Sequence, residues 1–180
     1  MRRLAFLLIP IVAFATDCSK KAKPLTANLN VENKVALRTI RLYFESPQML
    51  LAAETRDVQL PENPAGALPA VMRELVKGSA NQGVPQVLPP DTVIRGAFLL
   101  PDGLALVDLG GPTLTQGWGA GSHGELIAVY SVVQTVVANF PQARRVRLLI
   151  NGEPAETLAG HVAVDRSLGP MNSLIEPRSR

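Results

Sequence analysis

The side chains of this sequence that could support hydrolytic chemistry are Ser122, His123, His161 and several aspartates. A serine hydrolase needs a serine activated by a histidine that a carboxylate orients. Ser122 does not lie in the G-x-S-x-G turn that exposes such a nucleophile. The two histidines are far apart in the sequence and lack the neighbouring carboxylates of a zinc site. We therefore expect no catalytic residues, no metal and no cofactor, and keep a hydrolase that uses Ser122 and His161 as an alternative.

A G-x-G-x-x-G pattern spans residues 119–124, directly before a predicted helix. In dinucleotide-binding proteins the first glycine follows a strand at once, and amides at the helix start hold the phosphates. Here the preceding strand ends near Leu109, well before the pattern, and the chain after the helix is too short for the expected βαβ unit. Ser122 and Glu125 instead have the S-x-x-E spacing of a capping box. We therefore expect a capped helix rather than a nucleotide site.

Asp108 and Trp118 are candidate contacts for a ligand or a partner. Asp108 follows an apolar strand, where it either anchors a polar ligand or forms an Asx-type turn that satisfies the backbone of its own loop, the interpretation that we favour. Trp118 lies in a glycine-rich loop, where it either plugs the end of a sheet or presents an aromatic surface. We expect the loop, with Thr115 and Gln116, to form the partner- or ligand-binding surface.

The composition excludes several classes of protein. The chain has 180 residues, enough for one ordinary domain, and 47% of them are hydrophobic, enough to build a core. Aromatic residues make up only 4%, which leaves few side chains to stack on nucleic-acid bases. The net charge of +3 is too small to indicate a basic face that would bind phosphates. The single cysteine excludes an intrachain disulfide. We expect no nucleic-acid partner.

The first residues have the pattern of an export signal. Arg2 and Arg3 precede a run of 12 largely apolar residues, 4–15, and the chain then turns abruptly polar. A helix needs about 20 apolar residues to cross a bilayer, so this run is too short for a permanent transmembrane span. The sequence therefore predicts an exported protein.

Two interpretations of the cleavage site remain open. In one, residues 1–17 are removed and Cys18 is lipidated, as in a bacterial lipoprotein, although the acidic Asp17 is unusual before such a cysteine. In the other, cleavage after Ala15 leaves Cys18 as a free thiol close to the new terminus. The first interpretation is favoured because the only cysteine lies where a lipid would be attached. It places the protein in the cell envelope, anchored to the membrane on the extracytoplasmic side.

Apolar periodicity and turn residues predict eight elements in the order ββαββαββ. This order is typical of an α+β two-layer sandwich, with two helices on one face of a mixed or antiparallel sheet. Residues 18–34 are expected to form the lipidated N-terminus and a flexible tether, 35–170 the domain, and 171–180 a disordered tail. The expected strands lie near 35–44, 48–59, 93–100, 104–109, 145–150 and 155–158, and the expected helices near 67–77 and 122–140.

An ordered series of short segments between about residues 39 and 168 resembles the GerMN domain, a sporulation and germination domain of bacterial envelope lipoproteins. The resemblance implies an extracytoplasmic, often lipid-anchored module without established catalytic residues, which serves assemblies at the envelope. The segments that carry it are Ile40–Phe44, Arg73–Gly78, Leu88–Thr92, Gly103–Leu109, Glu125 with Tyr130–Thr135, Val146–Gly152 and Leu158–His161.

From these observations we expect a non-enzymatic envelope module that binds another envelope protein, in assemblies of the sporulation or germination type. A different class of function remains open, in which Asp108 and Trp118 bind a small ligand or the glycan of peptidoglycan. Both alternatives use the surface of the domain rather than a reactive centre.

Overall fold

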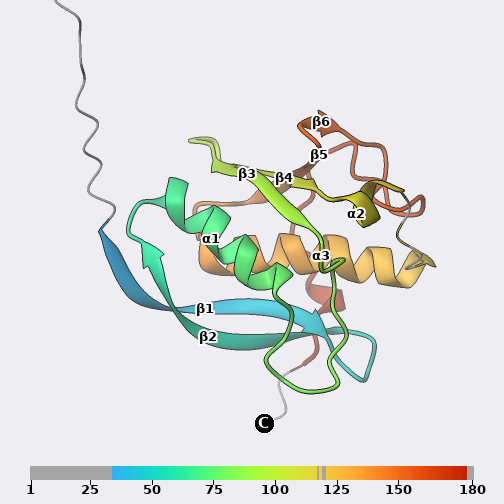
Figure 1. Cartoon of the computed structure of the whole chain (residues 1–180), viewed down its shortest axis with the longest axis horizontal. Coiled ribbons are helices and arrows are strands. Elements are labelled where there is room, and N and C mark those ends of the chain that lie inside the picture. The colour runs from blue at the N-terminus through green and yellow to red at the C-terminus, as the bar shows by residue number, and fades with distance from the viewer. Residues whose placement is uncertain (1–33, 117, 119–120, 178–180) are drawn as a thin grey trace, which may run out of the picture. The chain divides into compact units, whose positions relative to one another are not determined.

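An antiparallel hairpin begins the folded part of the chain in a computed structural model that describes residues 34–116, 118 and 121–177 (Figure 1). Its strands are β1 (Val35–Glu45) and β2 (Leu51–Pro61), paired from end to end without a register shift. The five-residue connection contains Met49 at a φ of 60°, a left-handed conformation that is uncommon outside glycine. The expectations for the signal peptide and Cys18 lie outside the described residues.

Helix α1 (Pro64–Val76) follows the hairpin and buries one face, formed by Ala67, Leu68, Val71, Met72 and Leu75. It begins earlier than the predicted 67–77 because Asn63 caps it, accepting a hydrogen bond from the Gly66 amide at 2.7 Å. Pro64 suits the first helical position, since its missing amide would have no partner there. Gly78 follows the helix at a φ of 87° and ends it.

Four strands form a second sheet in the order β3-β4-β5-β6. They are β3 (Val93–Leu99), β4 (Leu104–Gly110), β5 (Arg145–Ile150) and β6 (Glu153–Pro154), of which β4 and β5 run parallel. The turn Asn151–Gly152 has positive φ at both residues, as a type I′ hairpin requires. The prediction of a final strand at 155–158 is wrong, because β6 pairs with β5 directly after this turn and ends at Pro154.

Helix α3 (Gly121–Asn139) crosses the molecule between the two sheets (Figure 1). It contacts β1, β5 and α1, while α1 contacts β1, β2 and β3. Most of its residues from Glu125 to Val136 are buried, polar ones included. A short helix that the sequence did not indicate, α2 (Pro112–Gln116), lies between β4 and α3.

The α+β class and the order of the predicted elements are confirmed. The strands do not form one sheet, however, because α3 occupies the free edge of β1. The Ser131 hydroxyl donates to the Tyr43 carbonyl at 2.5 Å, the Tyr43 amide donates to Thr135 Oγ1 at 3.2 Å, and the Arg41 amide donates to Asn139 Oδ1 at 2.8 Å. Side chains of the helix thus take the place of a neighbouring strand.

The segment from Leu168 to Glu176 is ordered, which corrects the expected disordered tail at 171–180 for residues up to 177. Leu168 exchanges two backbone hydrogen bonds with Val146 of β5, at 2.7 and 2.8 Å. Leu174, in a short 3-10 turn, is buried, and Ile175 bridges to Leu51 of β2. The segment is ordered because it extends both sheets in turn.

Candidate functional site

The expected binding loop begins with helix α2, which is fixed to the segment just before β3. Gly111 approaches the backbone so closely that a Cβ there would meet the Asp91 carbonyl oxygen at 2.6 Å. Asp91 Oδ2 accepts a hydrogen bond from the Thr113 amide at 2.9 Å, and this bond is the main cause that holds the pKa of Asp91 below its usual range. Leu114 is the buried residue of α2. The start of the loop is therefore held rigidly against the core.

The outer face of α2 carries two of the predicted contact residues. Thr115 and Gln116 are both exposed, and the Thr115 hydroxyl donates to the carbonyls of Gly111 and Pro112, at 3.0 and 3.1 Å. Trp118, two residues later, is half-buried and packs against the hydrophobic core. Trp118 is therefore partly packed and partly accessible, which leaves both of its expected roles as predictions. We call Thr115, Gln116 and Trp118 together the α2 surface.

Asp108 lies in a different setting. Its Oδ1 accepts a hydrogen bond from the Gly152 amide at 2.8 Å, and its Oδ2 lies 3.4 Å from Nε of Arg95. The carboxylate is therefore occupied by the backbone of the turn between β5 and β6 and by a cation on β3. The expected Asx-type turn is therefore wrong, because the bonded amide belongs to the turn between β5 and β6, 44 residues later, and not to the loop after Asp108. Its role as a ligand anchor stays a prediction.

The capping role that the sequence predicts for Glu125 is wrong. The S-x-x-E spacing predicts that it caps α3, but α3 already includes Ser122 within its first turn, and the Glu125 side chain turns inward and is fully buried. Its Oε1 accepts hydrogen bonds from the amides of Leu158 and Ala159 at 2.8 and 2.7 Å, and its Oε2 accepts one from the His161 amide at 2.6 Å. An acid in a helix that is otherwise apolar on more than one face is the signal that could have indicated this role.

The groups around Glu125 explain how a charged carboxylate is tolerated in the core. Burial raises the pKa of its carboxyl, but the backbone amides of residues 158–162 outweigh burial and hold the pKa below its ordinary value. His161 adds a side-chain contact, with Nδ1 3.2 Å from Oε2. This cluster joins two segments that carry the GerMN resemblance and that lie far apart in the sequence.

The residues considered for hydrolysis take part in other contacts. His161 is held by Glu125, and His123 Nε2 lies 2.8 Å from Glu45 Oε1 at the end of β1. Ser122 is exposed in the first turn of α3. Within the described residues, no three side chains of His, Cys, Asp or Glu are placed to hold a metal ion. In the same part of the chain, no helix combines the length and apolar character needed to cross a membrane.

Comparison with known proteins places this geometry in a family. Residues 41–156 match the family model Germane, described as sporulation and spore germination. The first GerMN domain of the sporulation protein GerM from Bacillus subtilis is 23% identical, with a TM-score of 0.56 over 72% of this chain and 97% of that domain. No curated protein matches the sequence.

Two further solved structures share the fold. The tandem GerMN domains of the same Bacillus subtilis protein are 22% identical, with a TM-score of 0.57 over 73% of this chain. The chain spans 46% of that tandem structure, about the length of one of its two domains. A suspected lipoprotein from Clostridium perfringens is 13% identical, with a TM-score of 0.50 over 75% of this chain and 87% of that one.

Proposed function

Because the chain belongs to the Germane family, whose description is sporulation and spore germination, we propose that it is an exported module that binds another envelope protein. A lipid on Cys18 anchors it to the membrane on the extracytoplasmic side, and the folded domain contributes its surface to an assembly of the sporulation or germination type. It acts without catalysis, as a contact between envelope proteins. Mass spectrometry of the native N-terminus tests the anchor, since a lipidated Cys18 has a characteristic mass.

The observation that carries this proposal is the α2 surface. Trp118 is partly packed on the core and partly accessible, and it lies two residues after the exposed Gln116. A partly buried aromatic side chain costs little conformational entropy when it is covered, and tryptophan is enriched among the residues that dominate interface energies. The bond from the Thr113 amide to Asp91 holds the helix in place before any partner arrives.

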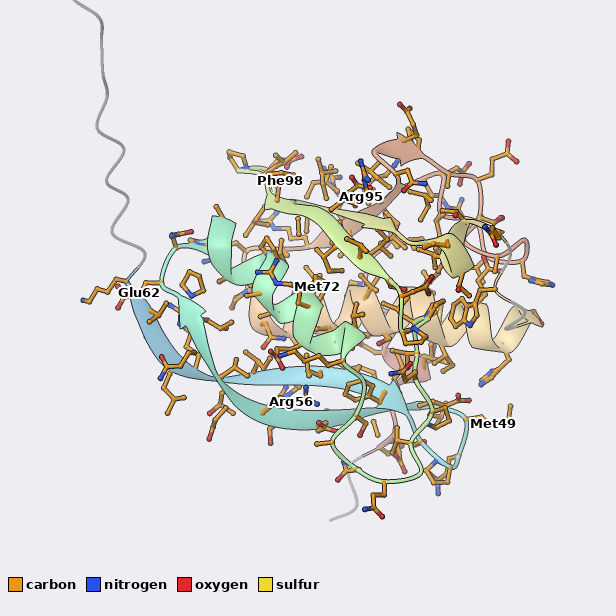
Figure 2. All side chains as sticks on the ribbon, viewed as in Figure 1. Met49, Arg56, Glu62, Met72, Arg95 and Phe98 are labelled. Carbon is orange, nitrogen blue, oxygen red and sulfur yellow. The ribbon has the colours of Figure 1, made fainter. Side chains whose placement is uncertain are left out.

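The test is recovery of the partner from membranes after chemical cross-linking, with the intact chain and a Trp118→Ala variant. We expect recovery to fall at least about tenfold, because truncating an aromatic hot spot removes more than about 1.4 kcal/mol of binding. Phe98→Ala is the matched control, since Phe98 is an aromatic residue on β3 with 58% of its surface exposed (Figure 2). We expect this control to bind normally.

Trp118 also contacts the core, so its loss can weaken folding as well as binding. Gln116→Arg keeps the test decisive, because Gln116 is exposed and its replacement leaves the core intact. Both variants must unfold cooperatively at temperatures close to that of the intact chain. If folded Trp118→Ala and Gln116→Arg chains both recover the partner normally, the α2 surface is not the contact.

A further inference from the structure

A second surface lies at the turn of the β1–β2 hairpin. It has the shape and charge of a binding groove. Two hollows of about 280 and 390 Å³ adjoin there and share Glu45, Ser46, Pro47 and Val84. We call them together the hairpin-end groove. The hairpin turn forms one wall, and the loop of residues 79–85 forms the other.

The lining of the groove combines apolar side chains with several carboxylates. Phe44, Ala52, Ala53 and Val84 supply apolar surface, and Glu45, Glu54 and Glu176 supply carboxylates. Glu54 is paired with Arg56 at 2.7 Å and Glu45 lies 2.8 Å from His123, so Glu176 is the acid most open to a new cation. Neither lysine nor arginine is among the described residues that line the two hollows. A groove of this kind complements a side chain that has an aliphatic stem and a cationic head, because the stem covers apolar surface while the head meets the acids.

A network behind the groove holds it in shape. Arg56 bonds Glu54 at 2.7 Å and the Gly78 carbonyl at 2.9 Å, so it ties β2 to the end of α1 (Figure 2). Glu54 in turn accepts hydrogen bonds from the Ser79 hydroxyl at 2.5 Å and from the Asn81 side chain at 3.1 Å. The wall at 79–81 is therefore anchored to the hairpin, and a ligand would lose little affinity in ordering it.

The rim adds an exposed apolar residue in an unfavourable backbone conformation. Met49 lies in the hairpin turn beside Gln48, which lines the groove, and 57% of its surface is exposed (Figure 2). Its φ of 60° costs about 1–2 kcal/mol for a residue with a side chain, and glycine or asparagine would be cheaper. Methionine is common at surfaces that adapt to peptide partners.

From these observations we propose that the hairpin-end groove binds lysine or arginine side chains of an extended basic segment in a partner protein. The two hollows, of about 280 and 390 Å³, lie at the small end of the roughly 300–1,000 Å³ of ordinary ligand pockets, and each is of a size to receive a single side chain. Alternate side chains of an extended segment leave the same face about 6.6 Å apart, so neighbouring hollows can receive them in turn. The proposal rests on the proposed function only in taking the partner to be a protein.

The test is a fluorescence-anisotropy titration of the full-length chain with two labelled pentapeptides, Lys-Val-Lys-Val-Lys and Gln-Val-Gln-Val-Gln. We expect the lysine peptide to bind at least about fivefold more tightly at low salt, and the difference to shrink at ~0.5 M salt, where charges are screened within about 4 Å. Equal binding of the two peptides overturns the proposal.

Two variants locate the binding. Ala52→Phe fills the groove, because Ala52 lies on the same face of β2 as Glu54, and we expect it to abolish binding of the lysine peptide. Thr55→Phe places the same ring on the opposite, exposed face of β2, outside the groove, and should bind normally. If both variants bind the peptide equally, whether well or poorly, the groove is not the site.

Glu176→Gln removes one charge without adding bulk, so it remains informative if Ala52→Phe fails to fold. We expect binding of the lysine peptide to weaken about two- to fivefold, the range for one partly exposed ion pair. Glu153→Gln on β6, an exposed acid outside the groove, should leave binding unchanged. An equal effect of the two variants overturns the proposal. Because the titration needs no natural partner, it can fail or succeed independently of the Trp118 experiment.

Discussion

At the scale of single residues, Glu125 is the side chain on which a long irregular segment depends. Between β6 and Leu168 the described chain has only an isolated bridge, Thr157 with Ala163, and no helix or strand. Three of its amides point at the Glu125 carboxylate instead of at a neighbouring strand. A buried carboxylate is costly unless such donors surround it, so the charge and the loop conformation stabilise each other.

Replacing Glu125 by glutamine should lower the free energy of unfolding by about 3 kcal/mol. Glutamine keeps the shape, but its NH2 group faces amides that are themselves donors, and hydrogen bonds to a charged group contribute about 1.5–3 kcal/mol each. Urea denaturation measures the change, and hydrogen exchange at Leu158 and Ala159 should accelerate. Glu156→Gln, an exposed acid in the same segment, is the control and should change stability by less than about 0.5 kcal/mol.

The same variant should alter the pH dependence of stability in acid. The pKa of Glu125 is lower in the folded chain than in the unfolded one, so its contribution is complete above the unfolded-state pKa of about 4.3 and is lost as the pH falls through the folded pKa. Between neutral pH and strong acid the intact chain should therefore lose more stability than Glu125→Gln. Parallel curves for the two proteins would contradict this account of the buried charge.

The apolar faces of α3 could have indicated that Glu125 points inward, but not which groups surround its carboxylate. The letters Ser122 to Glu125 satisfy the capping-box spacing, and nothing within the helix shows that amides more than thirty residues later compete for the carboxylate. Asp108 was expected to bond the backbone of its own loop, as an acid at a strand end commonly does. Its actual partner is the Gly152 amide, which reaches Asp108 only through the pairing of β4 with β5, so neighbouring residues could not indicate it.

At the scale of elements, α3 supplies the polar edge that completes the hairpin. Ser131, Thr135 and Asn139 recur every four residues and so form one stripe along the helix. Asn139 acts like a peptide group of a neighbouring strand, since it accepts from the Arg41 amide at 2.8 Å and donates to the Arg41 carbonyl at 2.6 Å. At Arg41 and Tyr43 the edge of β1 therefore offers no free backbone to another chain.

Thr135→Val tests this edge with a change of nearly constant volume. The amide of Tyr43 loses its acceptor inside the protein, and the expected cost is about 1–3 kcal/mol in the free energy of unfolding. Thr55→Val, the same change at an exposed position of β2, should be nearly neutral. Chemical denaturation compares the two, and faster hydrogen exchange at Tyr43 identifies the cause. Equal stability of the two variants would mean that α3 does not support the edge of β1 through Thr135.

Elements with strong local signals were predictable, and their assembly was not. The turn at Asn151–Gly152 and the strand β5 follow from adjacent residues, because a two-residue turn with positive φ fixes the hairpin. The division into two sheets depends on the stripe from Ser131 to Asn139 meeting β1, a contact between residues about ninety positions apart. In the candidate surface, Trp118 was recognisable by type, but its half-buried state depends on how the loop packs on the core.

At the scale of the whole domain, the segment from Leu168 to Glu176 connects the two sheets. It pairs with Val146 of β5 at one end and with Leu51 of β2 at the other. Leu174 is buried between these two attachments, and Glu176 both donates its amide to the Leu51 carbonyl at 2.9 Å and lines the hairpin-end groove. The last described residues therefore link the stability of the fold to the shape of the groove.

Leu174→Ala should destabilise both sheets together, by about 2–4 kcal/mol, because it removes a buried side chain from the segment that joins them. Hydrogen exchange should accelerate at Leu51 in β2 and at Val146 in β5, whereas a purely local defect would affect only one of them. Leu37→Ala, at a leucine of β1 with 65% of its surface exposed, is the control and should cost less than about 1 kcal/mol. A Leu174→Ala chain as stable as the control would show that the two sheets hold together through the helices alone. Protection lost in β2 but retained in β5 would instead limit the role of the segment to the hairpin, and the groove would then depend on Glu176 without being coupled to the rest of the domain.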